Sequence, residues 1–264
     1  MLVAHATVDL SPNDIGFIHG IALAAAQSGE RELLTLHSYE GGPVFDPVGP
    51  ALWLTRWGLP GDHIKQRFVP CSGYDDVAEA LLAACRSARP DLLILPTHER
   101  SGVSRLFMGS VAEAVARNLS IPCLLLPLNG RRFVEQQTGK VTLERMLVLG
   151  GTPTDAQLGV DSAAWFARGI GIADAQATML HVFDRTQFPE TTQPPELRLR
   201  VQHRAGELND VVTMVCAEQQ PQLIVMVSHG HDQLRDVLFA NRTERVLRAA
   251  HRPLLWVPAT FNPR

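Results

Sequence analysis

Apolar and polar positions follow two alternating patterns along this chain. Short, wholly apolar runs of strand length, such as LLIL at 92–95 and LIVMV at 223–227, are separated by runs with helical spacing. Tyr74–Ala88 is a clear helical run, because Val77, Leu81 and Cys85 fall on one face. Strands that alternate with helices favour parallel sheets covered on both faces.

The pattern predicts the same order of elements in both halves. Strands are expected at Leu2–Asp9, Glu32–Ser38, Ile64–Pro70, Asp91–Leu95, Cys123–Pro127, Arg145–Leu149, Gln176–Phe183, Leu197–His203, Leu223–Val227 and Leu254–Val257. Helices are expected at Asn13–Ser28, within Tyr39–Asp62, and at Tyr74–Ala88, Ser110–Leu119, Thr154–Arg168, Gly206–Gln219 and Asn241–Ala250.

The last part of each half has the same sequence pattern. Asp91–Pro127 aligns without a gap with Gln222–Pro258, and His98/His229, Glu113/Glu244 and Pro122/Pro253 are among the identical pairs. A repeat of about half the chain predicts two copies of one domain. We expect one domain at 1–130, a polar linker at 131–140 and a second domain at 141–264.

Composition narrows the class of protein and its partners. The 264 residues are 45% hydrophobic and 19% charged, with a net charge of −3, so no global basic field attracts nucleic acid or an anionic membrane. None of the four cysteines forms a C-x-x-C pair, which indicates a reducing compartment. The N-terminus lacks a basic signal region and no run approaches a membrane span, so a cytoplasmic location is expected.

Ligands of open α/β sheets bind at the carboxyl ends of strands, where the strand order reverses. Helix N-termini there offer free N–H groups to a phosphate. The segments expected at these ends are Asp9–Ser11, Pro96–Glu99 and Gly109–Ser110 in the first half, and Gly150–Thr152, Val227–Gly230 and Ala240–Asn241 in the second.

Two stretches at these positions resemble the C-terminal signature of the universal stress protein superfamily. They are THERSGVSRLFMGSVAEAV, from Thr97, and SHGHDQLRDVLFANRTERVL, from Ser228. The openings VDLSP and LGGTP, and the Leu-His pairs ending at His37 and His181, fall where that family has its first two strands.

The resemblance implies a tandem member of that superfamily. The implied fold is α/β, with two doubly wound, five-stranded parallel-sheet domains of strand order 3-2-1-4-5, like the adenine nucleotide alpha hydrolases. It also implies that the halves pair as a pseudo-dimer, with Cys123–Leu126 and Leu254–Val257 as the expected contact.

ATP-binding members of the superfamily carry Gly-x(2)-Gly-x(9)-Gly-(Ser/Thr), and an Asp that ends the first strand helps to hold the nucleoside. The first half places Pro96 and Glu99 at the two leading glycines but keeps Asp9 and Gly109–Ser110. Proline removes a backbone donor, and the glutamate adds negative charge beside the position of a triphosphate.

The second half departs from the motif differently. Val227 replaces the first glycine, Gly230 keeps the second, Ala240–Asn241 replace Gly-Ser, and Gly150 stands at the Asp position. Neither half therefore carries a complete motif. The candidate cofactor-binding residues are Asp9, Leu10, Ser11, Thr97, His98, Gly109, Ser110, Ser228, His229, Gly230 and Asn241.

Several of these residues also have a purely structural explanation. Ser110 with Glu113, and Asn241 with Glu244, fit helix-capping boxes, which alone account for their presence in both halves. His98 and His229 are expected to be loop histidines with ordinary hydrogen bonds, because a metal site needs three or four converging ligands.

Three functional hypotheses follow. The preferred one is a non-catalytic stress-response protein with degenerate nucleotide sites, which acts through a protein partner or a small ligand. The second is an adenine-nucleotide-binding protein, or slow ATPase, with its site in the first half. The third is a hydrolase or metal enzyme using His98 and Glu99, or His229 and His231. The sequence is also compatible with a homodimer of two such tandem chains.

Overall fold

The chain folds into two compact units. The computed structural model describes residues 1–7, 14–29, 31–38, 49–71, 76–97, 110–127, 129–182, 190–229 and 250–263. The first unit comprises Met1–Leu128 and Val134–Thr142, and the second comprises Asn129–Phe133 and Leu143–Arg264. Both units are α/β, as the alternating pattern predicts.

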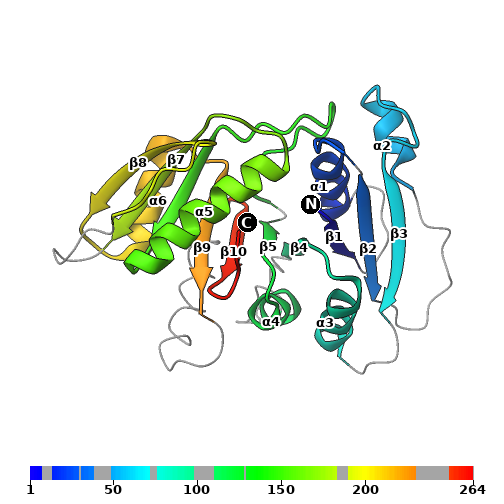
Figure 1. Ribbon diagram of the computed structural model, residues 1–264, viewed down its shortest axis with the longest axis horizontal. Helices are drawn as coiled ribbons and strands as arrows, with labels where there is room; N and C mark the ends of the chain where they lie inside the picture. Colours follow the sequence, from blue (N-terminus) through cyan, green and yellow to red (C-terminus); the bar gives the residue numbers. More distant parts are fainter. Residues whose placement is uncertain are drawn as a thin grey trace. The chain divides into compact units, whose positions relative to one another are not determined.

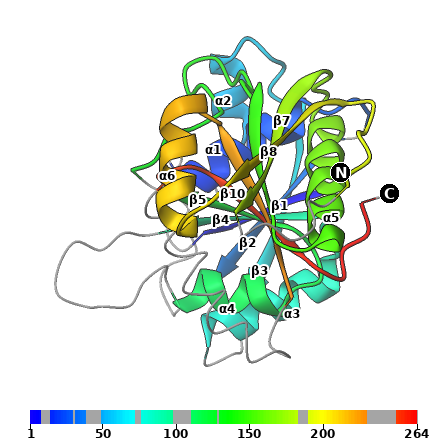
Figure 2. The same ribbon diagram turned by 90° about the vertical axis from the view of Figure 1, so that its left-hand side faces the viewer.

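A parallel sheet forms the centre of the first unit, with the order β3-β2-β1-β4-β5 (Figure 1). Its strands are β1 (Val3–Thr7), β2 (Glu32–Ser38), β3 (Lys65–Cys71), β4 (Leu92–Thr97) and β5 (Cys123–Pro127). The described helices are α1 (Ile15–Ala25), α2 (Ala51–Arg56), α3 (Val77–Ala88) and α4 (Ser110–Asn118). Helices α1 and α2 cover one face of the sheet, and α3 and α4 cover the other (Figures 1 and 2).

The second unit repeats this topology, with the order β8-β7-β6-β9-β10. Its strands are β6 (Arg145–Gly150), β7 (Ala175–Val182), β8 (Leu197–Arg204), β9 (Leu223–Ser228) and β10 (Leu254–Pro258). Its described helices are α5 (Pro153–Gly169) and α6 (Leu208–Gln219), which lie on opposite faces of these strands (Figure 2). The strand order 3-2-1-4-5 is thus confirmed.

The central strands are apolar because helices cover both of their faces. Leu92, Leu93 and Ile94 of β4 have no exposed surface, and neither do Leu223 and Ile224 of β9. A strand buried on both faces needs apolar side chains at odd and even positions alike, which explains the continuous runs LLIL and LIVMV.

The predicted linker is divided between the two units. Phe133 is fully buried in the second unit, where its ring meets Phe166 edge to face, with 6.2 Å between centroids. The next residue, Val134, bridges to Val141 within the first unit. Within the first unit, the indole N–H of Trp57 donates to Gln136 O at 3.0 Å. The predicted linker is therefore held by contacts within the unit to which each of its parts belongs.

Element boundaries differ from the predicted ones by a few residues at most. Helix α1, for example, starts at Ile15 because Asp14 is its N-cap, and it ends at Ala25, three residues before the expected Ser28. The expected helix Asn241–Ala250 lies outside the described residues, except for Ala250.

Candidate functional site

In each unit, the direction in which successive strands are added to the sheet reverses once. In the first unit the reversal lies between β1 and β4, because β2 and β3 extend to one side of β1 and β4 lies on the other. In the second unit it lies between β6 and β9. Open parallel sheets bind ligands at the carboxyl ends of such strands, so these are the two candidate sites.

At the second candidate site, the segment after β6 begins helix α5. Thr152 is its N-cap, and the Asp155 N–H donates to Thr152 Oγ1 at 3.2 Å. Pro153 occupies the first helical turn, where a missing N–H leaves no bond unmade. Asp155 therefore lies in the first turn of α5, where the helix dipole favours a negative charge.

His229, directly after β9, contacts this turn. Its Nε2 lies 2.8 Å from Asp155 Oδ1. The histidine side chain is 37% exposed and the aspartate side chain 12%, so the pair lies at the edge of the solvent. Because a carboxylate oxygen accepts, Nε2 of His229 is the donor in this contact.

Gly150 ends β6, at the position of the nucleoside Asp of the resembling family. A Cβ placed on it would lie 2.9 Å from Met179 Sδ and 3.0 Å from Ala156 Cβ. The buried His181 also reaches this point, where its Nδ1 donates to Gly150 O at 3.1 Å. A Cβ at this position would thus be crowded by Met179 and Ala156.

A similar replacement is seen at the first candidate site. Pro96 takes the place of the first motif glycine, and a Cβ on Gly16 of α1 would lie 2.9 Å from Pro96 Cγ. Asp14 caps the same helix, and its Oδ1 accepts from the Phe17 N–H at 2.7 Å. The proline ring and a helix-capping carboxylate therefore lie together beside the end of β4.

Only a few of the predicted site residues fall in the described part of the chain. Thr97 is 6% exposed, and its hydroxyl donates to Leu126 O at 3.3 Å. Ser228 is half-buried at the end of β9, and its carbonyl accepts from the Ala259 N–H at 2.7 Å. Ser110 begins α4. The residues outside the described ranges are Asp9, Leu10, Ser11, His98, Gly109, Gly230 and Asn241.

Asp155 is the site residue that sequence analysis did not single out, whereas Thr152 closes the predicted segment Gly150–Thr152. A signal was present, because Thr-Pro followed by Asp at the third helical position is a helix-start pattern directly after a predicted strand. The position of His229 beside Asp155 had no such signal, since 74 residues separate the two.

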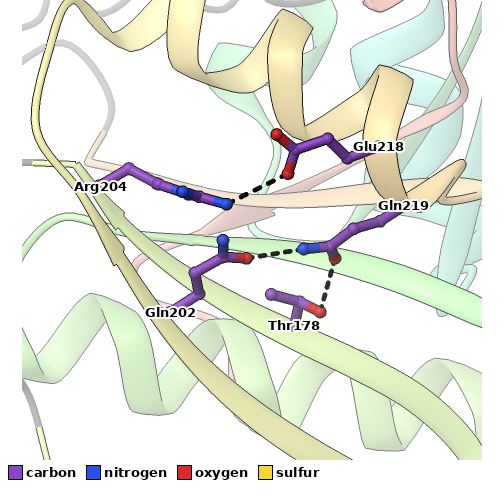
Figure 3. A network of polar contacts seen from close by, with 5 residues as sticks. All are labelled: Thr178, Gln202, Arg204, Glu218 and Gln219. Atoms are coloured by element: carbon purple, nitrogen blue, oxygen red, sulfur yellow. Dashed lines mark hydrogen bonds and ion pairs between the residues drawn. The ribbon is translucent and has the colours of Figure 1, made fainter.

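A second polar cluster lies between α6 and the strands β7 and β8 (Figure 3). The Thr178 hydroxyl donates to Gln219 Oε1 at 2.8 Å, and Gln219 Nε2 donates to Gln202 Oε1 at 2.6 Å. Arg204 Nη2 lies 3.1 Å from Glu218 Oε2 beside them. These groups bond to one another and fasten α6 to the sheet, so we assign them a structural role.

The described residues offer no cluster of three or more His, Cys, Asp or Glu side chains that could hold a metal ion. Among the same residues, no helix is long and apolar enough to cross a membrane.

Comparison with solved structures supports the same fold. A universal stress protein from Archaeoglobus fulgidus DSM 4304 superimposes with a TM-score of 0.68 at 15% identity, covering 97% of this chain and 96% of that one. A proposed universal stress protein from Pseudomonas aeruginosa UCBPP-PA14 gives a TM-score of 0.65 at 11% identity, covering 97% and 92%. A search of curated proteins found no match.

The family assignment rests on sequence. The model of the universal stress protein family matches residues 72–127 and 172–258, which together exceed half of the chain and fall in both units. This chain therefore belongs to the universal stress protein family.

Proposed function

We propose that this protein is a non-catalytic universal stress protein whose two candidate sites do not hold ATP through the family's phosphate loop. On this proposal it acts through a protein partner or through a small ligand other than a nucleoside triphosphate. The observation that carries the proposal is the packing at Gly150, where Met179 and Ala156 crowd the Cβ position of the aspartate that would hold a nucleoside.

Electrostatics supports the same proposal at the second site. Asp155 places a carboxylate in the first turn of α5, where a bound phosphate would otherwise meet free N–H groups. Two like charges about 4 Å apart repel by roughly 4 kcal/mol at an effective dielectric constant of about 20. A ligand that brings no second negative charge beside Asp155 suits this site better than an anion.

Packing supports the proposal at the first site. Pro96 offers no N–H to a phosphate, and its ring lies so close to Gly16 of α1 that a Cβ there would be 2.9 Å from Pro96 Cγ. The competing hypothesis, an adenine-nucleotide site in this half, rests on Asp9 and Gly109, which lie outside the described residues, and on Ser110, which begins α4.

Calorimetric titration of the full chain with ATP tests the proposal. We expect no saturable binding in the low micromolar range for the native sequence. Replacing Pro96 and Glu99 together by glycine restores the motif of the first half and should create ATP binding that the further change Asp9→Ala removes. In the second half, Val227→Gly should gain nothing, because Gly150 and Ala240–Asn241 remain.

Low-micromolar ATP binding by the native protein would contradict the proposal. Its loss in Asp9→Ala would then assign the nucleotide to the first half, in favour of the competing hypothesis.

A further inference from the structure

Arg252 is a buried arginine at the amino ends of the strands of the second unit, two residues before β10 begins. It is only 5% exposed. Its Nη2 donates to Cys216 O at 3.3 Å and to Gln220 Oε1 at 3.1 Å, and its Nε has no partner among the described residues. A guanidinium has five N–H donors, so two neutral acceptors leave a buried positive charge poorly compensated.

Two further arginines, Arg131 and Arg145, add positive charge around Arg252. Arg145 is the first residue of β6, and the Arg131 N–H donates to His251 O at 2.9 Å, beside Arg252 in the chain. Burial is the main cause that lowers the pKa of Arg252; the neighbouring Cys216 raises it in part, and the charges of Arg131 and Arg145 lower it further. No carboxylate is among the described groups that act on it. Both Arg131 and Arg145 are exposed.

The first unit provides an internal comparison, because its backbone is bonded in the same way. There the Leu2 N–H donates to Asp91 Oδ2 at 2.6 Å, and the Asp91 N–H donates to Leu2 O at 2.9 Å. In the second unit the Arg145 N–H donates to Gln222 Oε1 at 2.7 Å, and the Gln222 N–H donates to Arg145 O at 2.9 Å. Arginine thus replaces leucine, and a neutral amide replaces a carboxylate.

The position of Arg252 also gains positive charge in the second unit. Arg252 aligns with the half-buried Ile121 of the first unit, so an aliphatic residue has become a cation. The C-terminal ends of α3 and α6, which precede β4 and β9, have the same backbone conformation, since Arg89 and Gln220 both have φ of 50°. The two units therefore share the backbone here and differ in charge, which is what a site specific to the second unit requires.

We propose that Arg131, Arg145 and Arg252 form a binding site for a phosphate-type oxyanion. Arg252 supplies its Nε–H and remaining N–H groups from the buried base, and the two exposed arginines supply charge at the entrance. Guanidinium groups bind tetrahedral oxyanions through paired, charge-assisted hydrogen bonds. The site lies at the opposite ends of the strands from the candidate sites described above, so it is independent of the function proposed for them.

Thermal unfolding tests the proposal, because an anion that binds only the folded state raises the midpoint. The native chain is compared in sodium phosphate and in sodium chloride at equal ionic strength and pH. We expect a rise with phosphate that saturates. Arg252→Met should lose this rise and unfold in chloride at an equal or higher temperature, because an uncompensated buried charge is removed. Arg200→Gln, an exposed arginine of β8, should keep it.

A midpoint equal in the two salts, or a rise retained by Arg252→Met, would overturn the proposal. If Arg252→Met does not fold, the double variant Arg131→Gln/Arg145→Gln decides in the same way, since both side chains are exposed.

Calorimetry with two probes separates the sources of the anion. Binding of inorganic phosphate as tight as that of O-phosphoserine points to a free anion, and binding of O-phosphoserine tighter by at least about tenfold points to a phosphate carried on a larger molecule. Binding of neither probe overturns the proposal.

Discussion

His229 Nε2 lies 2.8 Å from Asp155 Oδ1, a contact that fastens the segment after β9 to the first turn of α5. The two strands that carry these segments are the neighbours between which the chain reverses direction. The pair therefore sits where open parallel sheets bind their ligands, and it gives that place the chemistry of a carboxylate and an imidazole.

We expect this pair to be energetically coupled. A double-mutant cycle with Asp155→Ala and His229→Ala, followed by urea unfolding, should give a coupling free energy of about 0.5–1.5 kcal/mol, because the carboxylate is largely shielded from water. The same cycle on the exposed pair Arg204 and Glu218 serves as the control and should give about 0–1 kcal/mol. Zero coupling between Asp155 and His229 would show that the contact does not contribute to stability.

Gly150 and Gly151 offer a matched test of the packing that excludes an aspartate. A Cβ at Gly150 would meet Met179 and Ala156 at 2.9 and 3.0 Å, whereas the nearest atom to one at Gly151 is an Asp155 oxygen at 3.7 Å. Gly150→Ala should therefore lower the free energy of unfolding by about 1–3 kcal/mol, and Gly151→Ala by less than about 0.5 kcal/mol. Equal effects in chemical unfolding would contradict the close packing at Gly150.

Much of the fold could be predicted from the sequence because its determinants are local. The runs LLIL and LIVMV are long enough to form buried strands, and the repeat shows each element twice. Helix α2 could only be placed within a wider segment, since six residues hold too few turns for a clear periodicity. It is fixed instead by the burial of Trp53 and Leu54.

The candidate site was less predictable, because it depends on contacts between distant residues. The departures from the family's motif at Pro96, Val227 and Gly150 could be read from the sequence. That Met179 fills the space beside Gly150 follows only from the register of β6 on β7, which pairs Val148 with Met179. A change at one strand end is thus explained by a side chain on another strand.

Trp57 occupies the space beside Gly139, which should make this glycine indispensable for the folded segment 134–142. A Cβ there would lie 2.3 Å from the indole ring, and the residue has φ of 70°. Gly58 has a similar φ of 76° with no atom within 4 Å, so Gly58→Ala measures the backbone strain alone. We expect Gly58→Ala to cost about 1–2 kcal/mol and Gly139→Ala at least about 1 kcal/mol more. Equal losses on thermal or urea unfolding would contradict the contact with Trp57.

His5, in the middle of β1, should make the first unit sensitive to acid. Its ring is 1% exposed, and Nε2 lies 2.9 Å from Thr35 Oγ1, which also accepts from Gln66 at 2.8 Å. Burial lowers the pKa of His5 from 6.5 to about 3. Below pH 6.5 the unfolded chain binds a proton at His5, whereas the folded chain binds it only near pH 3. The free energy of unfolding therefore falls as the pH falls from 6.5 to about 3.

The expected slope from this one group is about 1.4 kcal/mol for each pH unit. Urea unfolding of the native chain and of His5→Leu at several values between pH 6.5 and 4 measures it, and the variant should lose this part of the slope whatever its stability at neutral pH. His63→Gln, which removes a less buried histidine of the same unit, is the control, and its free energy of unfolding should keep the pH slope of the native chain. Parallel pH profiles for the native chain and His5→Leu would show that the buried ring does not resist protonation.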